Sequence, residues 1–87
     1  MGNFHKTELT FIVFGEQIEI TVESYRPFAD LRRMALEKVE IGDLAPEDFE
    51  IRCSRGSRID PKTYLDDELR KNTSRQFFLS LPVGFGG

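Results

Sequence analysis

Residues 8–23 read ELTFIVFGEQIEITVE, two runs of alternating apolar and polar side chains on either side of a glycine. Alternation with a period of two is typical of strands that bury one face. We therefore expect strands over residues 8–14 and 17–23, joined by a tight turn at Gly15-Glu16. The side chains predicted to point inward are Leu9, Phe11, Val13, Ile18, Ile20 and Val22.

After this hairpin the apolar period changes from 2 to 3.6. Pro27 is suited to the first turn of a helix, and Gly42 is a typical residue just beyond a last turn. We predict a helix of about 12 residues between them, long enough to lie across a sheet. Its inward stripe is Phe28, Leu31, Ala35 and Val39, with Met34 beside it, and its solvent side is Arg32, Arg33, Glu37 and Glu40.

Shorter patterns complete the domain. Strands are predicted over residues 48–53, 58–60 and 76–81, with a single helical turn at 64–69. Phe49, Ile51, Cys53, Phe77, Leu79 and Leu81 have inward parity. A helix between two strands of one sheet indicates a crossover, which makes the first and last strands parallel neighbours. The order of elements predicts an α+β fold of the β-grasp type, a mixed sheet of four to five strands packed on one helix.

Composition narrows the function classes. The 87 residues suit one domain, with a leader over 1–7, the folded part over 8–81 and a tail over 82–87. The net charge of −3 comes from interspersed charges, so we expect neither nucleic acid nor membrane as a partner. One cysteine excludes an internal disulfide and suits the cytoplasm. With His5 as the single histidine, no zinc site or Cys/His catalytic pair is expected.

Two clusters of charged residues do not require a binding site to explain them. Asp66, Asp67 and Glu68 are acidic residues at a helix start rather than a metal site. Arg52, Arg55, Arg58 and Arg75 are diluted by Asp48, Glu50 and Asp60, so we interpret them as a solvated mixed face, with docking to an acidic enzyme as a lesser alternative.

The chain resembles the ubiquitin-like family over residues 8–87. The resemblance rests on the hairpin, on PEDFEIR at 46–52 and on FLSLPVGFGG at 78–87. It is most similar to bacterial ubiquitin-like modifiers encoded beside homologues of activating enzymes, conjugating enzymes and JAB-type isopeptidases, which are the partners that the resemblance implies.

The resemblance also implies a role for the last residues. An activating enzyme would use ATP to adenylate the carboxylate of Gly87, capture it as a thioester and pass it to a target nucleophile, usually a lysine amine. The chain would then be a substrate rather than an enzyme and would need no cofactor of its own. Gly86 and Gly87 correspond to the conjugated end, and we expect Pro82, Val83, Gly84 and Phe85 to be recognised by the partners. The tail lacks the arginines of ubiquitin's tail.

The outer face of the sheet is a second candidate site. Strand parity places Ile12, Phe14 and Phe78 outward, where they would form an apolar patch unless residues 1–7 cover it. The recognition patch of ubiquitin draws on its third strand, where this chain has Glu50 and Arg52, so we expect a shifted patch for partners or for self-association. Two alternatives to a modifier stay open: a non-conjugated scaffold or self-assembling domain, and a sulfur carrier with a C-terminal thiocarboxylate.

Overall fold

A computed structural model of the chain describes residues 6–82. Five strands, two α-helices and one 3-10 turn follow one another along this part of the chain. Their bounds are β1 Lys6–Val13, β2 Glu16–Glu23, α1 Phe28–Leu36, η1 Pro46–Asp48, β3 Glu50–Cys53, β4 Arg58–Ile59, α2 Leu65–Lys71 and β5 Gln76–Ser80.

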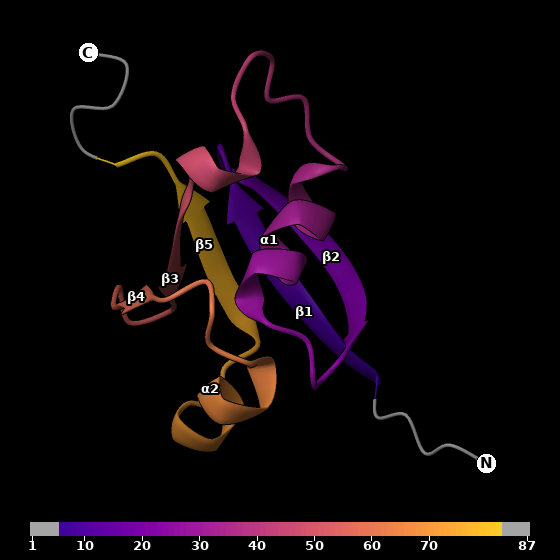
Figure 1. Cartoon of the computed structure of the whole chain (residues 1–87), viewed down its shortest axis with the longest axis vertical. Helices are drawn as coiled ribbons and strands as arrows, with labels where there is room; N and C mark the ends of the chain where they lie inside the picture. Colours follow the sequence, from indigo (N-terminus) through magenta and orange to yellow (C-terminus); the bar gives the residue numbers. More distant parts are fainter. Residues whose placement is uncertain (1–5, 83–87) are drawn as a thin grey trace.

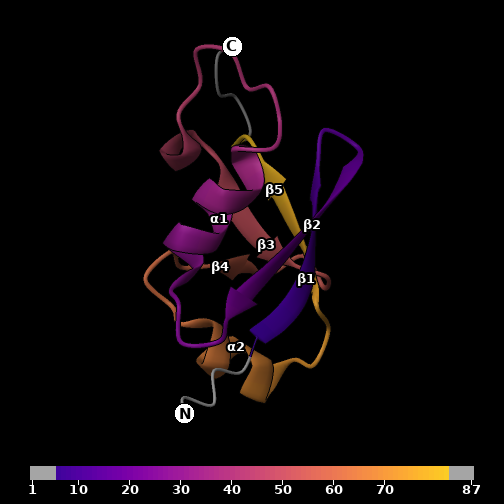
Figure 2. The ribbon, with the colours of Figure 1, turned by 90° about the vertical axis from the view of Figure 1, so that its right-hand side faces the viewer.

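The five strands form one mixed sheet in the order β2-β1-β5-β3-β4 (Figure 1). β1 is antiparallel to β2 and parallel to β5, while β3 is antiparallel to both β5 and β4. The predicted parallel pairing of the first and last strands is therefore confirmed, with β5 in the middle of the sheet. Turned by 90°, the molecule shows α1 on one face of the sheet and α2 beyond one end of it (Figure 2).

The core lies between α1 and the sheet. Every residue predicted to point inward from the strands is buried there, except Leu81, which is half-buried and packs against the core. Phe77 is at its centre, with its ring centroid 5.6 Å from that of Phe11 and 5.1 Å from that of Phe28. Leu36, Ile59 and Leu65 complete the core and were not predicted.

The hairpin differs from its prediction at both ends. β1 begins at Lys6, because Lys6 pairs with Glu23 and Thr7 with Val22, so residues 6 and 7 belong to the sheet and not to the predicted leader. The turn is Phe14-Gly15 rather than Gly15-Glu16. Both residues have positive φ, 52° and 81°, as in a type I′ turn, whose twist matches that of the flanking strands.

The helix is shorter than predicted. α1 ends at Leu36 because the next amides make 3-10-type bonds, from Lys38 N–H to the Ala35 carbonyl and from Val39 N–H to the Leu36 carbonyl, both 3.1 Å. Val39 still packs against the core. Gly42 adopts a φ of +62° further along the loop, so it does not end the helix.

Arg32 was placed on the solvent side, and this was wrong. It is 8% exposed, and its Nη1 donates a buried 2.8 Å hydrogen bond to the Phe49 carbonyl. Position 32 lies four residues after Phe28 and four before Leu36, both buried, so it falls on the inward stripe. Burial lowers the pKa of its guanidinium, and the nearby Glu47 carboxylate opposes that effect.

Smaller differences concern element bounds. β3 begins at Glu50 because residues 46–48 form η1, whose start is held by a 2.8 Å bond from the Ala45 N–H to the Asp48 carboxylate. β4 ends at Ile59 and β5 at Ser80, each one residue early. α2 extends to Lys71, beyond the single turn predicted. Among the helices of residues 6–82 there is none with the length and apolar character that crossing a membrane requires.

Candidate functional site

The strand that leads into the predicted conjugation tail is the central one. β5 pairs with β1 on one side and β3 on the other, and its last residue, Ser80, is opposite Glu50. Leu81 and Pro82 follow, both half-buried. The conjugation terminus Gly86-Gly87 and the recognition residues Val83, Gly84 and Phe85 lie outside the described residues, so their roles stay predictions.

Two of the three predicted patch residues, Ile12 and Phe78, come together on the outer face. Ile12 of β1 is the register partner of Phe78 of β5, and both side chains are half-buried. The same register row runs across all five strands of the sheet, in the order Gln17, Ile12, Phe78, Arg52 and Arg58. An apolar pair therefore lies at the middle of this face, with polar side chains on either side.

Phe14 closes one end of this pair. It belongs to the β1–β2 turn and not to a strand, so the outward position expected from strand parity does not apply to it. Its side chain is among the most exposed apolar ones at 58%, and its ring meets the core residue Phe49 edge-on at 5.7 Å. Ile12, Phe14 and Phe78, which we call the apolar strip, line a shallow depression of about 430 Å³ together with Arg52. A large apolar side chain held in a turn conformation that such residues avoid favours a role in binding over one in stability.

A charged cluster borders the strip on β3 and β4. The Glu50 carboxylate, only 15% exposed, is 2.8 Å from Arg52 and 3.5 Å from Arg58. Arg52 also donates a 2.7 Å bond to the Gly56 carbonyl, which fixes its guanidinium at the wall of the depression. The outer face of β3 is thus occupied by paired charges, and the apolar surface is displaced toward β1 and β5.

The depression also reaches Cys53, whose predicted inward position is confirmed by an exposure of 4%. Burial raises the pKa of its thiol, but hydrogen bonding with the backbones of Arg55 and Ser57 and with the Ser57 side chain lowers it, and the net pKa is below its ordinary value. Within residues 6–82 there is no group of three or more His, Cys, Asp and Glu residues that could hold a metal ion. The outer face therefore offers contact chemistry: apolar area flanked by fixed charges.

A third surface feature was missed in the sequence. Tyr25 and Tyr64 are 57% and 53% exposed and line a second, open depression with Asp66, Asp67 and Arg70. Backbone bonds from Leu65 N–H to the Arg26 carbonyl and from Asp66 N–H to the Ser24 carbonyl, 2.9 and 3.0 Å, join the two segments. Neither tyrosine follows a strand or helix period, so periodicity gave no signal for this pairing.

Comparisons with known proteins identify the fold and nothing finer. No family model matches the chain, and no curated protein is significantly similar to it. A protein designed de novo on the basis of ubiquitin is similar in structure, with a TM-score of 0.72 over 99% of both chains and a sequence identity of 18%. At that identity the similarity shows the fold alone. The chain has a ubiquitin-like, β-grasp fold, as the sequence predicted.

Proposed function

We propose that this chain is a ubiquitin-like protein modifier, joined to its targets through the carboxylate of Gly87. The observation that carries the proposal is the position of β5, which is held in the centre of the sheet and leads through Leu81 and Pro82 toward Val-Gly-Phe-Gly-Gly. A rigid body followed by a glycine-rich segment suits a narrow enzyme channel, because glycine has no β-carbon to exclude it.

The proposed reaction needs no catalytic residue of the chain. The Gly87 carboxylate attacks the α-phosphate of ATP, pyrophosphate leaves, and an acyl adenylate forms on the activating enzyme. A cysteine thiolate of that enzyme displaces AMP to form a thioester. A target amine then displaces the thiol and forms an amide. Gly87 reacts with its carboxylate free, either as encoded or after trimming, and ATP is a substrate of the activating enzyme, not a cofactor of this chain.

The partners of this reaction follow from the bacterial modifiers that the sequence resembles. We propose an activating enzyme, a conjugating enzyme and a JAB-type isopeptidase that removes the modifier, all in the cytoplasm. Pro82, Val83, Gly84 and Phe85 distinguish cognate enzymes from those that require arginines in the tail, because an apolar ring at Phe85 needs a complementary groove.

The test is reconstitution with the activating enzyme encoded nearest to this chain. With ATP, we expect a slower-migrating adduct that a reducing agent removes, as a thioester requires. Deleting Gly86 and Gly87 should abolish this adduct. Deleting residues 1 and 2 shortens the opposite end by the same amount and should leave it intact. If the adduct survives loss of Gly86 and Gly87, the modifier proposal is wrong.

The apolar strip favours a second candidate, a non-conjugated interaction domain that binds a partner or a second copy. In that case neither the full chain nor the chain without Gly86 and Gly87 forms the adduct, and Phe78→Asp abolishes the association. Thr21→Asp is the matched control, because Thr21 is exposed on the same face of the sheet, lies on β2 outside the depression and gains the same charge. Intact mass after incubation with the activating enzyme, ATP and a sulfide donor distinguishes the sulfur carrier. In that case sulfide displaces AMP from the Gly87 acyl adenylate, so one carboxylate oxygen leaves with AMP and sulfur takes its place.

A further inference from the structure

A polar pocket lies between the β3–β4 turn and α2, away from the apolar strip. In both views α2 lies below β4 (Figures 1 and 2). The pocket has a volume of about 270 Å³. Its polar lining comes from the turn, from β4 and from the end of α2: Arg55, Ser57, Arg58, Glu68, Lys71 and Asn72.

The charge of this lining is opposite to that of the whole chain. Three cationic side chains and one carboxylate surround the pocket in a chain whose net charge is −3. Within residues 6–82, no carboxylate lies within salt-bridge distance of Arg55 or Lys71, and Arg58 has a single contact, 3.5 Å from Glu50. Two cations at the pocket therefore keep their full capacity to bind an anion.

Asn72 adds an unused donor. Its Oδ1 accepts a 3.1 Å bond from the Ser74 N–H, which fixes the orientation of the amide and leaves Nδ2 on the other side. That nitrogen is buried and has no hydrogen-bond acceptor in the part of the chain that the structure describes. A buried donor without a partner costs free energy, and an acceptor that reaches it recovers that cost.

We propose that this pocket binds a phosphate group. Two guanidinium groups, one ammonium and the Asn72 amide offer more donors than the two oxygens of a carboxylate use, and they match the three terminal oxygens and double negative charge of a phosphate monoester. Arginine forks suit phosphate in particular. Glu68 opposes the anion, so binding depends on both unpaired cations.

The test is a titration of the full chain with inorganic phosphate, followed by amide NMR shifts at constant ionic strength. We expect saturable shifts confined to residues 54–59 and 71–73. Replacing Arg55 and Lys71 together by Gln should raise the dissociation constant by at least about tenfold, since each removes a charge-assisted contact. Both side chains are exposed, so the variant should fold, as the dispersion of its amide spectrum will show.

The matched control replaces Lys6 and Arg33 by Gln, which removes the same charge from exposed positions outside the pocket and should change the constant less than about twofold. A phosphoserine peptide tests a protein source of the phosphate: tighter binding than inorganic phosphate identifies a phosphorylated partner, and equal binding a free phosphate ligand. Three results would overturn the proposal: amide shifts that rise linearly with phosphate concentration without saturating, amide shifts equal to those that acetate causes, or an equal loss of phosphate affinity in both double variants.

Discussion

At the scale of single residues, Phe14 is an example of a side chain that contributes more to a candidate binding surface than to the stability of the fold. A φ of +52° is a strained conformation for a side chain of this size, with a cost of about 1–2 kcal/mol. Its edge contact with Phe49 returns about 0.5–1.5 kcal/mol. Phe14 therefore adds little net stability to the turn, but it provides the most exposed ring of the apolar strip. Asn or Gly would satisfy the same turn without strain.

Two substitutions of Phe14 test this account. Both Phe14→Asn and Phe14→Ala remove the ring, but Asn tolerates positive φ better than Ala. We expect the Asn variant to be more stable than the Ala variant by about 0.5–1 kcal/mol in urea unfolding. Equal free energies of unfolding would show that the backbone of this turn is not strained in solution.

The pKa of the Glu23 carboxyl leads to a prediction of how the stability of the fold depends on pH. The Arg26 Nε–H donates a 2.7 Å bond to its carboxylate, and this bond is the largest cause of a pKa below the ordinary value of 4.5. The unfolded chain therefore takes up this proton first as pH falls, so the stabilisation is present above about pH 4.5 and is lost as pH falls through the folded pKa.

The measurement is the free energy of unfolding at pH 7 and at several values below 4.5. We expect Glu23→Gln to lose less stability over this range than the unsubstituted chain, and Arg26→Gln to behave in the same way because it removes the donor. Glu16→Gln, on the same strand and without an ion pair in residues 6–82, should keep the original acid response. A Glu16 effect as large as that of Glu23 contradicts the assignment.

At the scale of elements, Arg32 fastens η1 to α1. Its bond to the Phe49 carbonyl joins the helix to the segment that enters β3. Arg32→Met keeps most of the aliphatic stem but leaves that carbonyl without its buried donor, so we expect a loss of about 1–3 kcal/mol. Arg33→Met is the matched control: its side chain is 57% exposed, its pair with Asp30 is a surface one, and its effect should stay within about 0.5 kcal/mol.

Hydrogen exchange can show which part of the fold loses stability in the Arg32→Met variant. Amide protection of Asp48 and Phe49, which bond to the Ala45 and Pro46 carbonyls, should fall in Arg32→Met, while that of Phe11 in the central pair of strands should fall only with global stability. Uniform loss across the sheet would mean that Arg32 supports the core as a whole and does not fasten this one segment.

The elements also show what the sequence could predict. Strand parity identified the inward face and the convergence of Ile12 with Phe78, because period 2 and a crossover helix together determine both. Periodicity could not locate the turn at Phe14, since an aromatic residue rarely adopts positive φ. The sequence predicted a mixed charged face that includes Glu50, Arg52 and Arg58, but not their pairing, because the pairing depends on the register of β3 against β4, which loop geometry sets. The Arg32 error was avoidable: its place on the stripe was readable from Phe28 and Leu36.

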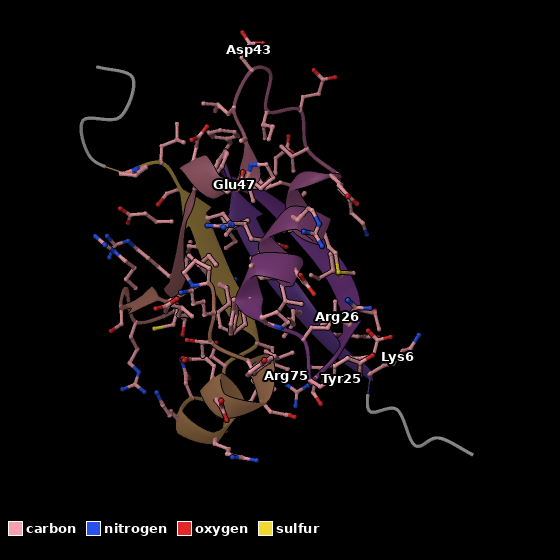
Figure 3. All side chains as sticks on the ribbon, in the orientation of Figure 1. Lys6, Tyr25, Arg26, Asp43, Glu47 and Arg75 are labelled. Carbon is pink, nitrogen blue, oxygen red and sulfur yellow. The ribbon has the colours of Figure 1, made fainter. Side chains whose placement is uncertain are left out.

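At the scale of the molecule, charge is unevenly distributed. Residues 37–50 carry six carboxylates and one lysine. Figure 3 places Asp43 and Glu47 at one end, and Lys6, Tyr25, Arg26 and Arg75 toward the other. The pairing of Glu50 with Ser80 joins the acidic end to the end of β5. An enzyme that takes up the segment after Pro82 therefore approaches an acidic surface, and a basic docking surface on that enzyme would accelerate the encounter.

Charge reversal at this end gives a prediction for the proposed activation step. Asp43→Lys with Glu47→Lys should lower kcat/KM for adenylation by about tenfold at low salt, with the difference shrinking as ionic strength rises, because exposed charges are screened. Asp66→Lys with Asp67→Lys makes the same change in net charge on α2, at the opposite end (Figure 1), and should have little effect. Equal effects of the two pairs would mean that total charge governs the encounter. A difference that persists at high salt would indicate direct contact of Asp43 or Glu47 with the enzyme, since a close, desolvated pair is screened far less than a distant one.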